Sequence, residues 1–187
     1  MLKQMLSNMV QNTATVKGSF ASDDEIKSLP KSASEYKMVS FDIVSLYTNI
    51  PLDETIGIIL NCLYDIEAAP SSTITRKNMK KLLEIATKHS NFLFNGKIYD
   101  QIDGVSMGSP LAPLLAEIFL QDFEKKHQES FKEMGITYWT HFVDDTFVLL
   151  DPNVSGGSLR ARLSQLHPAV KFTFEEERLP NSNDLEK

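Results

Sequence analysis

The sequence has a single cysteine and no long hydrophobic run, and both absences narrow the class of protein. A lone Cys62 excludes an internal disulfide and is typical of a reducing compartment. No apolar stretch approaches the roughly 18 residues that cross a bilayer, and polar residues interrupt the N-terminal stretch, which argues against a signal peptide. We therefore expect an intracellular protein, in the nucleus or the cytoplasm, with no membrane partner.

Positive charge is also scarce, because 19 Lys and Arg residues face 25 Asp and Glu residues and leave a net charge of −6. This balance is unfavourable for a nucleic-acid binder, since neutralisation of phosphates by Lys and Arg drives such binding. An acid-rich catalytic part still fits if basic parts of the same machinery lie on other segments. The hydrophobic content of 42% and the length of 187 residues indicate one globular domain with a real core.

Hydrophobic periodicity and turn signals predict a mixture of helices and strands. Helices are expected at 2–11, 22–29, 53–66 and 158–166, and a long helix is expected to start at Pro110. A further helix should follow the cap residue Thr75, with Met79, Leu82, Leu83 and Ala86 facing inward. Strands are expected at 36–42, 91–94, 97–99, 137–143, 146–150 and 170–174, with Asn95-Gly96 as a hairpin turn. Hairpins stand beside helices in this order, so the α+β class fits better than a doubly wound parallel sheet.

Two adjacent aspartates, Asp144 and Asp145, lie at an expected hairpin tip between runs of apolar strand formers. Such tips favour Asn-Gly or Asp-Gly, and two carboxylates repel each other there, so a cation should compensate them. Asp42 ends another strand-like run about 100 residues earlier. If the two strands are neighbours, the carboxylates project from one end of the sheet and could hold a pair of Mg²⁺ ions, which prefer hard oxygen ligands. This arrangement is typical of a polymerase active site.

Taken singly, each of these features has a more ordinary explanation. An Asp-Asp pair is more often a solvated turn, and a strand-end aspartate is more often a cap or a turn residue. Tyr47, five residues after Asp42, would by itself be expected to pack in the core. The stretch Gly104–Pro110 would by itself be a good helix start, in which Gly108 allows close approach of the backbone. Only the combination favours a metal site.

Three stretches in this order resemble the catalytic motifs of reverse transcriptases of the Penelope-like retroelement group. They are Ser40-Phe-Asp-Ile-Val-Ser-Leu-Tyr-Thr-Asn-Ile-Pro51, Gly104-Val-Ser-Met-Gly-Ser-Pro-Leu-Ala-Pro113 and Phe142-Val-Asp-Asp145. A fourth stretch, Leu163–Glu177, resembles the palm segment that follows these motifs. The similarity runs from about Val16 to Glu177 and implies an α+β polymerase palm with an antiparallel sheet backed by helices.

The resemblance implies RNA-directed DNA polymerase activity, a two-metal transfer of nucleotides to a primer 3′-end. Asp42, Asp144 and Asp145 would be catalytic, and together with Ile43 they would hold two Mg²⁺ ions, for which Mn²⁺ can substitute. The nucleotide-binding positions would be Tyr47 as a steric gate against the 2′-hydroxyl, Gly108, Ser109 and Pro110 beside nucleotide and template, and Lys171 near the leaving pyrophosphate. The implied partners are an RNA template, a DNA primer and deoxynucleoside triphosphates.

Segments outside the similarity should lack the rest of the polymerase hand. Residues 1–15 are expected to be an N-terminal helical remnant, 16–177 the palm domain, and 178–187 a polar tail. Neither end resembles the basic fingers or the thumb. We therefore expect a partial right hand, a fragment of a retroelement polyprotein that needs these other parts for activity.

Two other functions are compatible with parts of the sequence. Gly104-Val-Ser106-Met-Gly108 has the G-x-S-x-G form of a serine hydrolase, with Asp144 or Asp151 and then His167 in hydrolase order. The polar residues 100–103 precede it, however, where a buried apolar strand is needed. The other alternative is a palm remnant that folds and binds a partner without catalysis.

Overall fold

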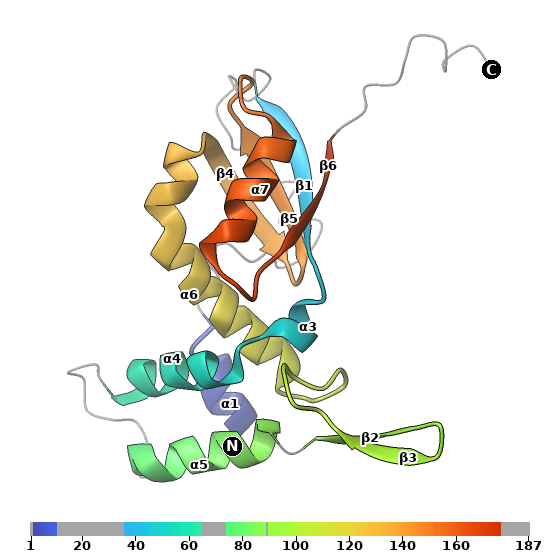
Figure 1. Ribbon diagram of the computed structural model, residues 1–187. Coiled ribbons are helices and arrows are strands. Elements are labelled where there is room, and N and C mark those ends of the chain that lie inside the picture. The colour runs from blue at the N-terminus through green and yellow to red at the C-terminus, as the bar shows by residue number, and fades with distance from the viewer. Residues whose placement is uncertain (1, 11–35, 65–73, 89, 177–187) are drawn as a thin grey trace. The chain divides into compact units, whose positions relative to one another are not determined.

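The computed structural model describes residues 2–10, 36–64, 74–88 and 90–176, and the helix expected at 22–29 lies outside them. The chain forms two compact units that interleave along the sequence (Figure 1). Residues 1–13 and 45–127 form the helical unit, and residues 14–44 and 128–187 form the sheet unit. Among the described residues, no helix combines the length and the apolar character that a membrane crossing requires.

The sheet unit contains a four-stranded antiparallel sheet in the order β4-β5-β1-β6. Its strands are β1 (Lys37–Ile43), β4 (Ile136–Phe142), β5 (Asp145–Leu150) and β6 (Phe172–Glu176). The strand expected at 36–42 is present as β1, and its side chains alternate, because Val39 and Phe41 are buried whereas Asp42 is exposed. The predicted start of the last strand at Val170 is two residues too early, since the Val170 amide donates to the His167 carbonyl in a turn (3.3 Å).

Helix α7 (Gly156–Leu166) covers one face of this sheet (Figure 1). It begins two residues before the predicted start at Ser158, and it buries Leu159 and Leu163 completely. Each buried leucine contributes about 1.5–3 kcal/mol by removing its side chain from water. The rings of Phe41 and Phe172 meet edge to face, with centroids 6.1 Å apart. An apolar core therefore fixes β1 between its two neighbouring strands.

The helical unit consists of helices and one hairpin. Its helices are α1 (Leu2–Ser7), α3 (Leu46–Asn49), α4 (Leu52–Tyr64), α5 (Arg76–Lys88) and most of α6 (Ala112–Glu133). Two of the residues predicted to face inward on α5, Met79 and Leu83, are buried, and α4 buries Ile56 and Ile59. Ala86, predicted to face inward, is exposed. Thr87 takes the buried position instead, because its hydroxyl can donate to the Leu83 carbonyl (2.8 Å).

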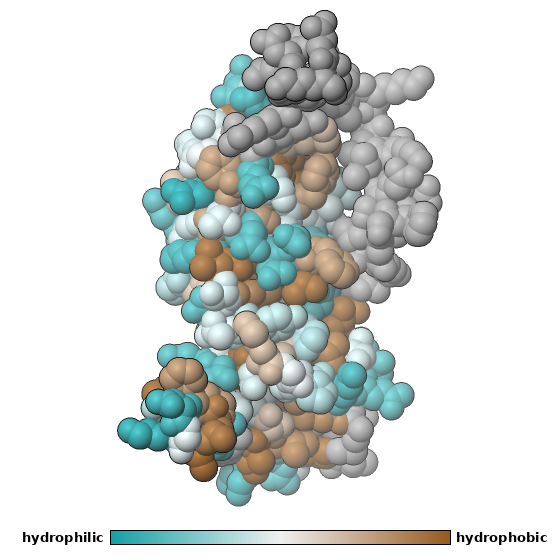
Figure 2. Space-filling view, turned by 90° about the vertical axis from the view of Figure 1, so that its right-hand side faces the viewer, coloured by the Kyte–Doolittle hydropathy of each residue, from teal (hydrophilic) through white to brown (hydrophobic). Residues whose placement is uncertain are grey.

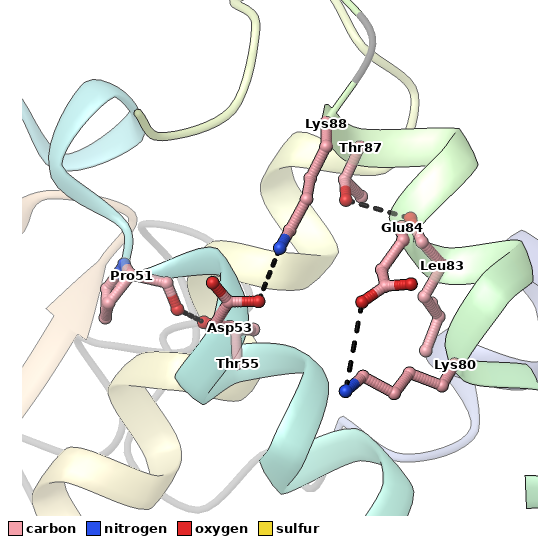
Figure 3. Close-up of polar contacts among 8 residues, drawn as sticks. All are labelled: Pro51, Asp53, Thr55, Lys80, Leu83, Glu84, Thr87 and Lys88. Atoms are coloured by element: carbon pink, nitrogen blue, oxygen red, sulfur yellow. Dashed lines mark hydrogen bonds and ion pairs between the residues drawn. The ribbon is translucent and has the colours of Figure 1, made fainter. Parts of the chain in front are cut away.

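Polar contacts join α4 to α5 (Figure 3). The ammonium of Lys88 binds the carboxylate of Asp53, which lies in the first turn of α4. At the other end, the guanidinium of Arg76 donates to the side-chain oxygen of Asn61 (2.8 Å). Thr75 caps α5 as predicted, its hydroxyl accepting from the amide of Asn78 (3.4 Å). The two helices are thus fastened at both ends.

Helix α6 begins at Ala112, two residues after the predicted start at Pro110. The reason is local, because residues 106–111 form turns before the helix. The Ser109 amide donates to the Ser106 carbonyl (3.0 Å), and the Ser109 hydroxyl accepts from the Leu111 amide (3.3 Å). Ser109 is therefore a turn residue beside the helix start.

Strands β2 (Asn91–Phe94) and β3 (Lys97–Asp100) form the predicted hairpin. Its two turn residues have positive φ, 49° for Asn95 and 74° for Gly96, as a tight two-residue turn requires. All eight strand residues are exposed. The hairpin therefore extends from the helical unit without joining its core (Figure 1).

Gly104 anchors the loop that follows the hairpin. Its φ is +69°, and an added Cβ would overlap the main chain of Thr48. The next residue, Val105, is buried, and its amide donates to the Tyr47 carbonyl (2.7 Å). Only glycine combines this conformation with this close approach.

Replacing Gly104 with alanine should therefore lower the free energy of unfolding by about 2 kcal/mol or more, from backbone strain and overlap together. Gly57→Ala is the control, because an added Cβ there meets nothing within 4 Å. Inside a helix that change should be neutral or stabilising by up to about 1 kcal/mol. Urea denaturation followed by circular dichroism measures both variants, and equal stability of the two would contradict the anchoring role.

Candidate functional site

The pairing of β1 with β5 brings two of the three predicted acids together. In this antiparallel register Asp42 lies directly opposite Asp145. The amide of Ile43 donates to the carbonyl of Asp144 (3.0 Å), which fixes the third acid at the same end of the two strands. Side chains that face each other in this way start only about 5 Å apart. The predicted convergence of Asp42 with the aspartate pair is therefore present.

The turn that carries the acids differs by one residue from the prediction. Val143 and Asp144 occupy the two turn positions, and Asp145 is already the first residue of β5, paired with Phe142. Val143 has a φ of 59°, which is a strained conformation for a β-branched residue. Strain of this kind costs about 1–3 kcal/mol and is concentrated at functional sites.

Loss of water and neighbouring negative charges both act on the Asp42 carboxylate. Loss of water around the Asp42 carboxylate raises its pKa, and the negative charges of Asp144 and then Asp145 raise it further. A hydrogen bond from the neighbouring Thr173 side chain acts in the opposite direction. The raised pKa means that the folded chain holds this negative charge less readily than an unfolded chain does.

The carboxylate oxygens of the three aspartates suit a hard cation, although their side chains are not arranged as a complete set of metal ligands. Within the described part of the chain, no group of three or more His, Cys, Asp or Glu residues is arranged so that it could hold a metal ion. Carboxylate oxygens are nevertheless the ligands that Mg²⁺ prefers, and Asp42 and Asp145 are exposed. Ile43 has a buried hydrocarbon side chain, so it could contribute only its main-chain carbonyl.

Lys171 makes contacts that sequence reasoning did not foresee. Its ammonium donates to the carbonyls of Ser164 (2.6 Å) and His167 (3.4 Å), at the C-terminal end of α7. A cation at this end of a helix is favourable because the last carbonyls lack helical partners. Its main-chain carbonyl also accepts from the Val44 amide (2.8 Å), next to the acid-bearing strand. Its predicted role toward pyrophosphate stays a prediction.

The nucleotide-binding stretches predicted around Tyr47 and Gly108 meet within the helical unit. The hydrogen bond from Val105 to Tyr47 holds the second motif against the end of the first. The side chain of Tyr47 is half-buried, and Pro110 is exposed. Gly108 has a φ of +95° and nothing within 4 Å of the position of a Cβ, so its backbone is open to a ligand.

The hydrolase candidates are held by local contacts. Ser106 donates to the adjacent Met107 carbonyl (3.5 Å). The Nδ1 atom of His167 accepts from the Ala169 amide (3.1 Å), and the Asp151 carboxylate accepts from the Asn153 amide (2.9 Å). The residues before Ser106 are not a strand, so the strand-turn-helix geometry of a nucleophile elbow is absent from this described segment.

Sequence reasoning missed two features of the molecule. Thr173 lies opposite Asp42 on β6, and only the strand register reveals this. Positive charge is concentrated between Arg76 and Lys97, which a count by segment would have found, whereas the total charge concealed it.

Residues 1–180 match the family model described as reverse transcriptase (RNA-dependent DNA polymerase). A search of curated proteins found no match. Among solved structures the chain is similar to telomerases. Apo telomerase from Candida tropicalis, truncated from its C-terminal domain, has a TM-score of 0.65 at 14% identity, over 97% of this chain and 40% of that one. Telomerase from Candida albicans in complex with the TWJ fragment of telomeric RNA has a TM-score of 0.66 at 11% identity, over 96% and 35%.

Telomerase from Candida tropicalis in complex with the same kind of RNA fragment has a TM-score of 0.67 at 12% identity, over 97% of this chain and 33% of that one. This chain therefore spans between 33% and 40% of the length of these three structures. At these identities the likeness concerns the fold alone. The predicted α+β palm, with its antiparallel sheet backed by helices, is confirmed.

The raised pKa of Asp42, which arises from loss of water and then from its negative neighbours, predicts that neutralising Asp42 stabilises the fold. Because its folded pKa is raised, the charged form destabilises the fold at pH 7, and this penalty disappears as the pH falls through the folded pKa and below the unfolded value of about 3.9. Asp42→Asn should gain less than about 1 kcal/mol at pH 7, since exposed charges are screened.

The measurement is urea denaturation of both proteins at pH 7 and pH 3, where the gain should vanish. Asp151→Asn is the matched control, because the Asp151 carboxylate accepts hydrogen bonds from Asn153 and should gain nothing when neutralised. A loss of stability in Asp42→Asn at pH 7 would show that the carboxylate is compensated within the protein.

Proposed function

Because this chain belongs to the reverse transcriptase (RNA-dependent DNA polymerase) family, we propose that it is the catalytic palm of an RNA-directed DNA polymerase. It extends the 3′-end of a DNA primer with deoxynucleotides on an RNA template. The motifs around Asp42, Gly104 and Asp144 resemble those of the Penelope-like group, which supports a place in that group and a retroelement origin. The chain spans between 33% and 40% of the three telomerase structures described above, and the proposed activity includes fingers and thumb segments that act together with this palm.

One observation carries this proposal, which is the register of β1 with β5. It places Asp42 opposite Asp145, and the Ile43 amide donates a hydrogen bond to the Asp144 carbonyl. Residues 42, 144 and 145, from two distant parts of the chain, thereby lie at one end of the sheet. Nothing in their packing requires acids there, since Asp42 and Asp145 are exposed and Asp42 is destabilised by its neighbours. A bound cation would turn this repulsion into attraction.

Asp42, Asp144 and Asp145 would hold two Mg²⁺ ions, with Mn²⁺ as a substitute, and the Ile43 carbonyl would complete the set. When bound, the ions supply the positive charge that activates the primer hydroxyl and neutralises the leaving pyrophosphate. The protein would position these groups through the rigid pairing of β1 and β5. Side chains on paired strands, and on the tight turn between them, are held in position more precisely than side chains on a flexible loop.

The helical unit would bind the incoming nucleotide. Tyr47 would exclude a 2′-hydroxyl, while Gly108, Ser109 and Pro110 would lie beside nucleotide and template. Two observations support this role. The hydrogen bond from the Val105 amide to the Tyr47 carbonyl holds the two motifs together. The open space beside Gly108 leaves its main chain accessible to a ligand. Lys171 would assist pyrophosphate release only after leaving the carbonyls of α7.

Primer extension tests the proposal, with a labelled DNA primer on an RNA template and a protein that carries this chain together with fingers and thumb. Asp144→Asn should reduce extension by more than about 100-fold, since even outer-shell partners of metal ligands cost about 10- to 100-fold. Asp151→Asn makes the same charge change at the far end of β5 and should leave extension unchanged.

Extension that survives in Asp144→Asn would refute the catalytic role of the cluster. A protein that binds RNA but never extends the primer, in any divalent cation, would instead favour the non-catalytic palm remnant.

A further inference from the structure

Positive charge in this acidic chain is concentrated in one segment. Of the 19 basic residues, six lie between Arg76 and Asp100, where Glu84 and Asp100 are the only acids. They are Arg76, Lys77, Lys80, Lys81, Lys88 and Lys97. The segment therefore carries four net positive charges, and the rest of the chain carries ten net negative charges. Helix α5 and the hairpin β2–β3 make up almost all of this segment.

Some of the lysines on α5 form ion pairs within the protein, and others are available to bind a partner. Lys88 is bound to Asp53, and Lys80 lies 3.9 Å from Glu84 on its own helix (Figure 3). Lys77 and Lys81 are exposed, and within the described residues neither forms an ion pair. They are four residues apart, so they lie on the same side of α5. This spacing presents two cations to one ligand.

The hairpin has two chemically different faces. Residues two apart on a strand share a face, and partners across the register share it too. Phe92, Phe94 and Tyr99 therefore lie on one face together with Lys97, which pairs with Phe94. The ring of Tyr99 stacks on Phe92 (5.6 Å between centroids, 19° between planes) and meets Phe94 edge on (6.4 Å).

The opposite face is aliphatic. It carries Leu93 and Ile98 and, at its base, a hydrogen bond between the side chains of Asn91 and Asp100. Both faces are open, since Phe94 is 67% exposed and Leu93 is 70% exposed. Figure 2, viewed from the side to which the hairpin points in Figure 1, shows hydrophobic side chains reaching the surface in the lower part of the molecule.

The chemistry of the aromatic face selects among possible ligands. Bases of a single strand stack on exposed aromatic rings, and lysines beside those rings neutralise the phosphates. A protein partner, or an apolar segment of this chain, would bury as much apolar surface on the aliphatic face as on the aromatic face. A stacked aromatic set with its own lysine, directly after a helix with two available lysines, fits a single strand better.

We propose that α5 and the hairpin β2–β3 form a binding surface for single-stranded RNA, with Phe92, Phe94 and Tyr99 stacking on bases and Lys77, Lys81 and Lys97 contacting phosphates. This surface lies apart in sequence from the acid-bearing strands. The identity of the strand as template rests on the proposed function, but its binding does not.

The test is fluorescence anisotropy with a labelled 12-nucleotide oligouridine RNA and the full chain, in EDTA, without primer or nucleotides. Phe94→Ala should weaken binding by about tenfold, the cost of one lost stacking contact. Leu93→Ala is the matched control, because it removes a similarly exposed side chain from the other face of the same strand. It should change the affinity by less than about twofold, within the effect of an ordinary surface substitution.

The charge contribution is tested by the salt dependence of the same binding. The double variant Lys77→Gln with Lys81→Gln should reduce the slope of log affinity against log salt by about 1.4, since each lost phosphate contact on a single strand accounts for about 0.7. Lys125→Gln, an exposed lysine on α6, should leave the slope unchanged.

Equal losses in Phe94→Ala and Leu93→Ala, or no measurable RNA binding, would overturn the proposal. Tighter binding to anionic phosphatidylserine vesicles than to RNA would also overturn it. A change in oligomeric state in Leu93→Ala that explains the change in fluorescence anisotropy would do the same. The binding assay contains EDTA and neither primer nor nucleotides, so its outcome does not depend on the acid cluster. Failure of this surface is therefore distinguishable from failure of the polymerase chemistry.

Discussion

The antiparallel pairing of β1 with β5 is the constraint on which the candidate site depends. Side chains alternate along a strand, so a slip of one residue would turn Asp42 to the buried face and Phe41 to the solvent. The register is fixed by the apolar side of β1, where Val39 and Phe41 are buried, against Val148 of β5. Packing on one face of the sheet therefore decides where the acids on the other face meet.

The site is costly to maintain. Asp42 faces two like charges, and Val143 adopts a left-handed conformation that a β-branched residue disfavours. Both costs are of a size that a buried sheet can offset, because each fully buried large apolar side chain contributes about 1.5–3 kcal/mol. Strained conformations and like-charge clusters of this kind are concentrated at functional sites.

The division of the chain into two units also separates the proposed chemistry. The sheet unit contains the three acids, whereas the helical unit contains the Tyr47 and Gly108 stretches and the basic segment. Counted over their sequences, both units are acidic, with net charges of −5 for the sheet unit and −1 for the helical unit. Within the helical unit, however, residues 76–100 carry four net positive charges, so a chain with a net charge of −6 still has a locally basic segment that could contact a nucleic acid.

Sequence patterns predicted the elements better than their boundaries. The alternation of β1 and the Asn95-Gly96 turn were readable because each follows from one local rule. The position of the acidic turn was not, since Val143-Asp144 and Asp144-Asp145 are both poor turn sequences and the register of β4 with β5 decides between them. The contacts of Lys171 depend on where α7 ends in space, which no local pattern contains. The basic segment was readable but was hidden by the average over the whole chain.

The most direct test of the central claim is nuclear magnetic resonance of the isotopically labelled chain during titration with Mn²⁺, which broadens the signals of nearby amides. The account predicts that the amides of Ile43 and Asp144 broaden at the lowest Mn²⁺ concentrations, while those of Asn95 and Gly96 keep their widths. Excess Mg²⁺ should reverse the effect. Broadening centred on another acidic group, such as Glu54 and Asp122 beside Lys126, would contradict the account.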